Sequence, residues 1–306
     1  MRDPAPLWVS LSASIIRALP FGRYCLGNAL ARFSGPPFLA HLPPDLGSAS
    51  FVCDLHDTIA REVCFTGRYE PQETQLARRL LGPGMTAVDV GANWGYFTLV
   101  CAHLVESQGR VMALEPHPRL ASMLTENVTA NQFAQVEVLQ VAAGSARGST
   151  PFVGFDERAG NSGVSRAARS TDVPEFESES AAVDDLLDER QIACVDLLKV
   201  DIEGGELAAL RGISEGLTHH RYRYILLECH PLELTAMGSS LAECLSPLLR
   251  AGYRGWRIDH SAEMHRRAAS QAVDFAELLR PFEDSRLADD PWPHFLWAAP
   301  GEQLPE

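Results

Sequence analysis

Lysine is almost absent from this chain: one of its 26 basic residues, Lys199, is a lysine and the other 25 are arginines. Basic residues are also outnumbered by 40 acidic ones, which gives a formal net charge of −14. A surface that binds nucleic acid needs clustered lysine and arginine, so the charge argues against a nucleic-acid partner. Because lysine and arginine are not interchangeable where geometry is tight, the single Lys199 indicates a specific role.

Paired cysteines and long apolar runs are also missing. The seven cysteines form no Cys-x-x-Cys pair, and their odd number favours reduced, buried thiols in a cytoplasmic protein. The apolar run at residues 7–16 is shorter than the ~20 residues that span a bilayer, so we expect no transmembrane segment. Asp3 and the lack of a small-residue cleavage site make a poor signal peptide.

Residues 1–45 are predicted to form a helical extension, because two Pro-Pro pairs at 36–37 and 43–44 separate them from the rest of the chain. Packing of this extension on the main domain is the first expectation. A helix lying on a membrane surface is the alternative.

A glycine turn between two apolar runs is the clearest motif. Residues 86–98 read Thr-Ala-Val-Asp-Val-Gly-Ala-Asn-Trp-Gly-Tyr-Phe-Thr, with the break at Gly91 and Gly95. This order predicts a buried strand, a tight turn and a helix. Glycines allow a ligand close to the backbone, and Asp89 can accept hydrogen bonds from it. The spacing differs from the Gly-x-Gly-x-x-Gly of dinucleotide sites, which argues against the competing class of nicotinamide-dependent oxidoreductases.

Strands alternate with helices along the rest of the chain. Further strands are predicted at 109–115, 134–142, 195–201, 224–230, 253–258 and 294–298. This alternation predicts an α/β fold with a mostly parallel sheet covered on both faces, whose ligand lies at the carboxyl ends of the strands. Five polar residues fall at or near those ends: Asp89, Glu115, Asp201, Glu228 and His230.

Three segments have weaker patterns. Residues 50–65 are predicted to form short strands around a turn, and residues 262–290 are polar and mixed. Residues 144–174 are rich in glycine and serine, with short strand-like pieces, and Asn161-Ser-Gly163 is a candidate turn over a pocket.

These segments together resemble the FkbM family of S-adenosylmethionine-dependent methyltransferases over roughly residues 45–300. The resemblance rests on Val88 to Thr98, Glu115-Pro116, Val183-Asp-Asp-Leu, and Asp196-Leu-Leu-Lys-Val-Asp-Ile-Glu-Gly-Gly-Glu206. It implies the doubly wound class I methyltransferase fold, with a seven-stranded sheet whose last strand is antiparallel. The domain would cover residues 46–300, followed by a tail at 301–306.

The resemblance also implies a cofactor and a reaction. S-adenosylmethionine (SAM) would donate a methyl group to a hydroxyl of a small molecule or glycan, such as a polyketide or a sugar. By position, Asp89 and Glu115-Pro116 would bind the cofactor beside the turn and at its ribose, and the loop from Ala142 would border the adenine. The turn itself would hold the methionine part through Gly91, Ala92, Asn93, Gly95 and Thr98.

The strand that carries Lys199 also carries the first catalytic candidate. Lys199 and Asp201 share one face of an extended strand. Asp201 would orient the acceptor or accept its proton, with a cap for the helix beginning at Gly204 as the alternative. His230 is a second candidate base, or an ordinary loop histidine. Asp201, Glu228 and His230 could also hold Mg²⁺, although no ligand spacing requires a metal.

One further alternative is a non-catalytic subunit that binds the cofactor. It is disfavoured by the polar groups retained at the strand ends. Neither the oligomeric state nor the acceptor is predicted from the sequence.

Overall fold

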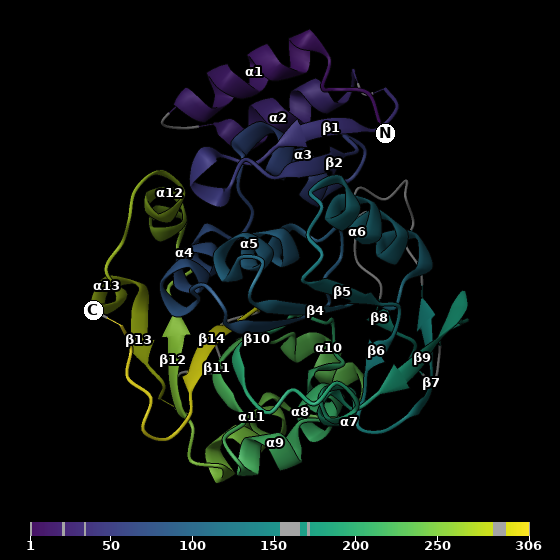
Figure 1. Cartoon of the computed structure of the whole chain (residues 1–306), viewed down its shortest axis with the longest axis vertical. Helices are drawn as coiled ribbons and strands as arrows, with labels where there is room; N and C mark the ends of the chain where they lie inside the picture. The colour runs from purple at the N-terminus through teal and green to yellow at the C-terminus, as the bar shows by residue number, and fades with distance from the viewer. Residues whose placement is uncertain are drawn as a thin grey trace.

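A mostly parallel sheet organises the chain in the computed structural model, which describes residues 2–19, 22–33, 35–153, 166–169, 172–283 and 292–305 (Figure 1). Within these residues the sheet has eight strands in the order β13-β12-β14-β11-β10-β3-β4-β5. Their bounds are β3 (Thr86–Val90), β4 (Arg110–Leu114), β5 (Val136–Leu139), β10 (Val195–Val200), β11 (Tyr222–Glu228), β12 (Arg254–Ile258), β13 (Leu279–Pro281) and β14 (His294–Ala298).

The pairing agrees with the expected class I methyltransferase fold. Strands β5, β4, β3, β10 and β11 are parallel, and β14 is antiparallel to both β11 and β12. The last strand therefore inserts between two earlier ones. The sheet exceeds the predicted seven strands because β13, in the segment read as polar and mixed, pairs with β12 at the edge. The strand predicted at 134–142 was too long, since β5 ends at Leu139.

Helices cover both faces of this sheet (Figure 1). Val88 and Val90 point toward one face, where they join the core formed with α7 (Val183–Glu189), α8 (Glu206–Arg211), α9 (Ser214–Thr218), α10 (Pro231–Ala236) and α11 (Leu241–Arg250). Ala87 points to the opposite face because side chains alternate along a strand. There it packs with α4 (Pro71–Leu80), α5 (Tyr96–Val105), α12 (Ala262–Ser270) and α13 (Phe275–Leu278).

The N-terminal part stands above α4 and α5 in Figure 1. It contains α1 (Leu7–Ala18), α2 (Arg23–Ala31), β1 (Phe38–His41), η1 (Pro44–Leu46), β2 (Ser50–Cys53) and α3 (Thr58–Thr66). Strand β1 pairs with β2, so this two-stranded sheet joins residues on both sides of position 45. The strands predicted for 50–65 were wrong beyond Cys53: Asp57 accepts a hydrogen bond from the Ala60 N–H and thereby caps α3.

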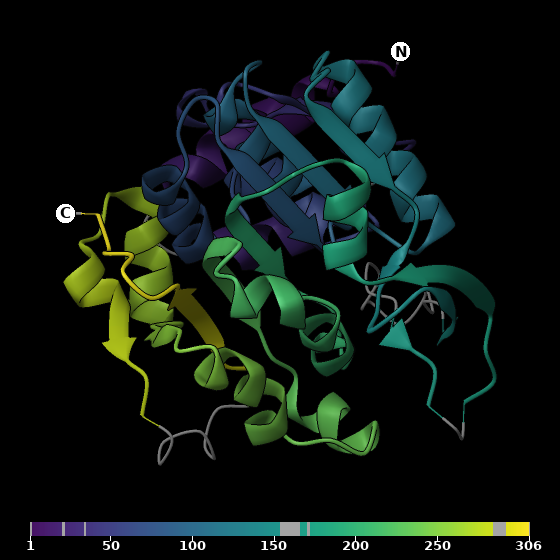
Figure 2. The same cartoon turned by 60° about the horizontal axis from the view of Figure 1, so that its bottom comes forward.

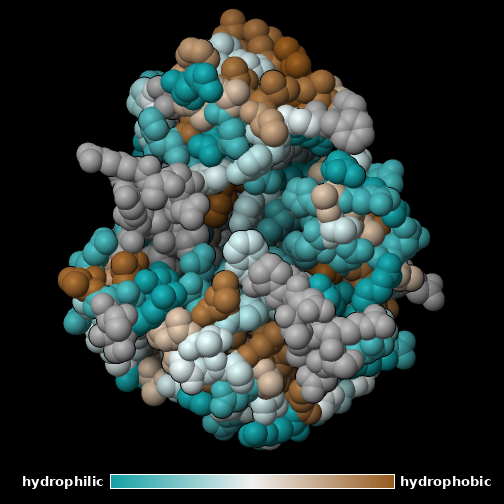
Figure 3. Space-filling model, turned by 180° about the vertical axis from the view of Figure 1, so that it is seen from behind, coloured by the Kyte–Doolittle hydropathy of each residue, from teal (hydrophilic) through white to brown (hydrophobic). Residues whose placement is uncertain are grey.

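Helix α1 exposes apolar side chains. Val9, Ala13 and Ile16 are buried, whereas Leu11 and Ile15 on the other face are largely exposed. Figure 3 shows the resulting hydrophobic area at the top of the molecule. Of the helices that the structure describes, none combines the length and the apolar character needed to cross a membrane.

A second sheet lies on the β5 side of the molecule (Figures 1 and 2). In the described residues it has four strands: β6 (Ala142–Ala143), β7 (Gly148–Val153), β8 (Arg166–Ala167) and β9 (Phe176–Ala181). Helix α6 (Pro118–Ala130) packs on β2 and β5. The candidate turn Asn161-Ser-Gly163 lies outside the described residues.

Candidate active site

A cavity of about 280 Å³ lies at the carboxyl ends of β3, β4, β10 and β11. Small-molecule pockets measure roughly 300–1,000 Å³, so the space is close to what a small ligand needs. Seven of the predicted cofactor residues line it: Asp89, Gly91, Ala92, Asn93, Glu115, Pro116 and Ala142. The predicted catalytic residues Asp201, Lys199 and His230 line the same cavity. The fold thus brings together in one cavity side chains that are up to 141 residues apart in the sequence.

Backbone hydrogen bonds to the end of β4 hold the glycine turn in place. The N–H groups of Gly91 and Ala92 both donate to the Leu114 carbonyl oxygen at 3.0 Å. Gly91 has φ +84°, and a Cβ there would lie 1.9 Å from the backbone oxygen of Asp201. Glycine is required at this point because β3 and β10 leave no space for a side chain. The turn therefore offers a ligand bare backbone rather than a set of free N–H donors.

Gly95 and Thr98 lie behind the cavity wall. A Cβ at Gly95, which has φ +89°, would lie 2.4 Å from Leu124 Cδ1 of α6. Thr98 Oγ1 donates to Asp89 Oδ2 at 2.6 Å and is fully buried. These two residues position the turn and Asp89, whereas the cavity surface is formed by their neighbours.

Asp89 presents an unsatisfied carboxylate oxygen. Its Oδ1 is buried and has no hydrogen-bond partner among the described residues. Burial raises the pKa of Asp89, while the Lys199 ammonium and the Thr98 hydroxyl oppose the rise. A buried polar atom without a partner is costly, and a cationic or hydroxylated ligand in the cavity would satisfy it.

Glu115 is fixed by the backbone at the end of β4. Its carboxylate accepts hydrogen bonds from the N–H groups of Asn93 at 2.8 Å and His117 at 2.9 Å. Burial raises the pKa of Glu115 to about 7, although these two hydrogen bonds favour the ionised form. Glu115 thus couples the glycine turn to the position predicted for ribose hydroxyls.

Lys199 lies at the centre of the acidic groups. Its ammonium is 2.7 Å from Asp201 Oδ2 and 3.2 Å from Glu70 Oε2, and its side chain is 7% exposed. Burial would lower the pKa of Lys199, but Asp201, Glu70 and Asp89 together raise it well above its usual value. The ammonium therefore remains charged. Because Asp201 accepts from Lys199 and Gly205 occupies the cap position of α8, the reading of Asp201 as a helix cap was wrong.

Glu70 is a site residue that the sequence did not indicate. The sequence showed only a break before a helix at Glu70-Pro71. In the structure Glu70 lines the cavity with φ +43° and ψ +65°, a conformation that costs a non-glycine residue energy. Burial raises the pKa of Glu70 to about 8, while Lys199 opposes the rise. This left-handed backbone conformation places Glu70 at the cavity, and no local sequence pattern predicts the conformation.

His230 is a cation in this environment. Its Nδ1 lies 2.6 Å from Glu206 and its Nε2 lies 3.3 Å from Glu228. Burial lowers the pKa of His230, but hydrogen bonds to Glu206 and Glu228 outweigh this and raise it to about 11. An imidazolium cannot accept a proton at neutral pH, so the geometry does not suit the predicted role as a base.

Asp201, Glu228 and His230 bring one donor atom each within 4.8 Å of the others. Asp201 already pairs with the Lys199 ammonium at 2.7 Å, and this cation would repel a metal ion bound beside it. Mg²⁺ also prefers oxygen ligands to an imidazole. The arrangement does not support the Mg²⁺ site considered from the sequence.

The strand order and the glycine turn are those of the class I methyltransferase fold. The turn without a Cβ at Gly91 and the open oxygen of Asp89 fit the cofactor, whose amino acid part carries an ammonium group. A model of the FkbM methyltransferase domain matches residues 89–254. The chain belongs to this family, and the competing assignment as a nicotinamide-dependent oxidoreductase was wrong.

Similar proteins include two curated relatives. The methyltransferase sdnD of Sordaria araneosa is 30% identical over 156 residues, which are 42% of this chain and 60% of that protein. The 31-O-demethyl-FK506 methyltransferase FkbM of Streptomyces tacrolimicus is 30% identical over 189 residues, 53% of this chain and 71% of that protein.

Solved structures with a similar fold include FkbM from Methylobacillus flagellatus KT, at 17% identity and a TM-score of 0.41, covering 89% of this chain and 57% of that one. Another is a putative rRNA methylase from Clostridium thermocellum, at 12% identity and a TM-score of 0.45, covering 76% and 96%.

Proposed function

We propose that this protein methylates a hydroxyl oxygen of a small molecule or glycan. The observation that carries the proposal is the meeting of two carboxylates, Asp201 and Glu70, on the Lys199 ammonium in the cavity that contains the glycine turn. Oxygen methylation requires a group that orients a hydroxyl and one that takes its proton, and this arrangement supplies both.

The shape and charge of the cavity support an acceptor with an apolar body. Beyond the glycine turn its walls include Ile59, Tyr69, Phe152 and Met237, with Arg166 as a basic group. The net charge of −14 disfavours nucleic acid. One relative is named as a 31-O-demethyl-FK506 methyltransferase, which agrees with methylation of an oxygen.

The roles of the residues follow from their contacts. When SAM is bound, its sulfonium makes the methyl group electrophilic. Lys199 holds Asp201 at 2.7 Å, so that the second carboxylate oxygen of Asp201 can orient the acceptor hydroxyl. Glu70, whose pKa burial raises to about 8, takes the hydroxyl proton. Alignment of donor and acceptor can supply roughly 7–11 kcal/mol of the barrier reduction when the geometry is ideal.

The experiment is a methyl-transfer assay with isotopically labelled SAM on the full chain, after calorimetry with SAM and its demethylated product. Hydroxylated macrolides, phenols and sugars are compared with amines, thiols, RNA and protein. We expect cofactor binding and a label on oxygen of a small molecule. Label on nitrogen, sulfur, RNA or protein would overturn the proposal. Cofactor binding without turnover on any acceptor would instead support the non-catalytic subunit.

A further inference from the structure

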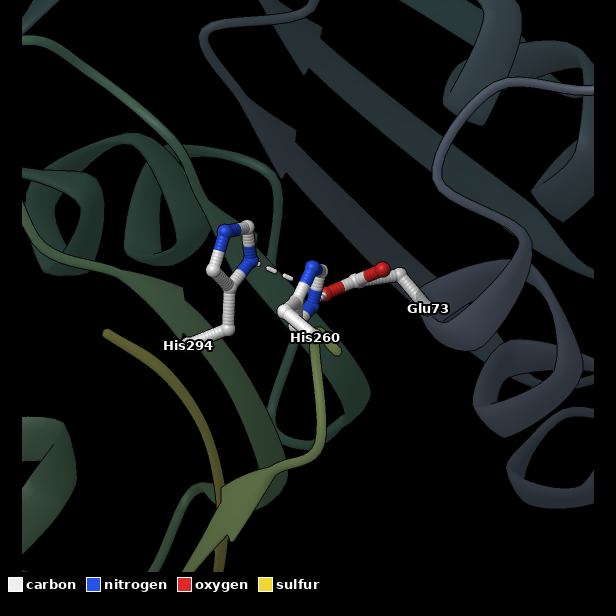
Figure 4. Close-up of side chains that lie close together, drawn as sticks. All are labelled: Glu73, His260 and His294. Atoms are coloured by element: carbon white, nitrogen blue, oxygen red, sulfur yellow. Dashed lines mark hydrogen bonds and ion pairs between the residues drawn. The ribbon is translucent and has the colours of Figure 1, made fainter. Parts of the chain in front are cut away.

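Three side chains of metal-ligand type meet outside the active-site cavity. Glu73 comes from the first turn of α4, His260 follows β12, and His294 begins β14. Figure 4 shows both imidazoles directed at the Glu73 carboxylate. One donor atom from each residue lies within 4.8 Å of the other two. The group joins positions 187 residues or more apart from Glu73, so it is formed by tertiary structure alone.

Both histidines contact the same carboxylate oxygen of Glu73. Glu73 Oε1 is 2.6 Å from His260 Nε2 and 2.9 Å from His294 Nδ1. The Glu73 side chain is 3% exposed, and its other oxygen, Oε2, has no hydrogen-bond partner among the described residues. A buried carboxylate therefore faces two imidazoles and retains an unsatisfied oxygen, which costs free energy unless another ligand occupies the site.

A proton can charge one of the two rings, but charging both is costly. The two imidazole rings are stacked with their centroids 3.7 Å apart, so charging both would place two cations in contact. His294 Nε2 also lies 3.6 Å from Glu228 Oε1. A divalent ion would supply the positive charge in place of the protons and would leave both rings neutral.

Two imidazoles and one carboxylate form the ligand set of many zinc sites and of non-haem iron sites. The Glu228 carboxylate near the outer nitrogen of His294 matches the partner that metal-bound histidines commonly have. Ligands ~2.1 Å from zinc lie about 3.4 Å apart, so each of the two nitrogens needs to move less than about 1 Å away from Glu73 Oε1, with the stacked rings turning apart.

We propose that Glu73, His260 and His294 bind one divalent transition-metal ion of the zinc type. The site is open at His260, whose side chain is 26% exposed, so water completes the coordination there. The ion ties α4 to the connection after β12 and to the start of β14. Because Glu228 lines the active-site cavity, the ion also fixes a residue of that wall through His294.

Metal titration of the chelator-treated full chain tests this proposal. Zinc binding is measured by calorimetry, and cobalt binding by its visible absorption, which reports imidazole and carboxylate ligation. We expect one equivalent of zinc to bind the wild type and at least a 100-fold weaker affinity in both His260→Ala and Glu73→Gln. His219→Ala removes an exposed imidazole elsewhere and serves as the matched control.

The variant Asp201→Asn separates this site from the group at Asp201, Glu228 and His230, and should bind zinc as the wild type does. Circular dichroism and SAM binding establish that each variant is folded. The proposal is overturned if the wild type binds no zinc, or if His260→Ala and Glu73→Gln bind it equally well. It is also overturned if Asp201→Asn abolishes binding. SAM binding and methyl transfer are separate measurements, so failure of the metal site and failure of the proposed function are distinguishable.

Discussion

Lys199 on β10 is the cross-strand neighbour of Asp89 on β3, and each is the penultimate residue of its strand. Both side chains point to the same face of the sheet, below the cavity. The single lysine of the chain thus places a buried ammonium among Asp89, Glu70 and Asp201. This pairing links the residue whose buried oxygen has no partner among the described residues with the residues proposed to act on the acceptor.

Replacing Lys199 by methionine should destabilise the protein strongly. Removing one partner of a buried ion pair leaves uncompensated charge and typically costs about 3–5 kcal/mol. We expect a loss of this size in the free energy of unfolding, measured by urea denaturation. Arg211→Met removes an exposed cation and should change it by less than about 0.5 kcal/mol. Equal stability of both variants would contradict the importance of the buried ammonium.

Gly91→Ala should abolish SAM binding. A Cβ there would lie 1.9 Å from the Asp201 backbone oxygen, and φ is +84°, so both the turn and β10 must shift. Gly82→Ala is the matched control, because nothing lies within 4 Å of its Cβ position. Calorimetry with SAM compares the two. Wild-type affinity in Gly91→Ala would show that the turn is not the cofactor site.

Asp201→Asn should lower turnover and leave cofactor affinity nearly unchanged. The amide keeps the shape of the side chain but loses the charge that pairs with Lys199 and orients a hydroxyl. Loss of the orienting carboxylate misplaces the acceptor, and a misplacement of about 1 Å can cost ~10²-fold, so a fall in kcat of about this order is expected. The exposed Asp274→Asn is the control. If kcat survives intact, Asp201 has a structural role alone.

The rate should depend on the ionisation of Glu70. Burial raises the pKa of this carboxyl to about 8, and a carboxyl accepts a proton only when it is ionised. The value of kcat/KM should therefore rise with pH and level off above about 8. In Glu70→Gln this rise should disappear together with most of the activity. A pH profile that is unchanged in Glu70→Gln would assign the proton transfer to another group.

Cofactor affinity should weaken in mild acid because of Glu115. Burial raises the pKa of this carboxyl to about 7, and its ionised form is the better acceptor for hydroxyl groups. Below pH 7 protonation competes with binding, so the Kd for SAM should rise about tenfold for each further pH unit. Glu115→Gln should bind more weakly at pH 8 and show no such dependence. Calorimetry at pH 6, 7 and 8 checks both.

Local patterns determined most of the sheet. The strands β3, β10 and β11 are short apolar runs bounded by turns or polar residues, and the turn at Gly91 follows from its own residues. These features depend on neighbours within a few positions, which is why they could be predicted. Helix α3 was missed because residues 50–65, which contain its cap Asp57, have the pattern of short strands around a turn. The strand β13 was missed because it is a three-residue edge strand in a polar segment.

What the sequence by itself determined is the class of fold, the glycine turn and the group of acids at the strand ends. The tertiary structure alone decided their charges and partners. His230 became a cation because Glu206 and Glu228 flank it, and Glu70 entered the site on the strained turn before α4. Glu73, His260 and His294 met from distant segments. Burial and long-range proximity set these properties, and both arise only when the chain is packed.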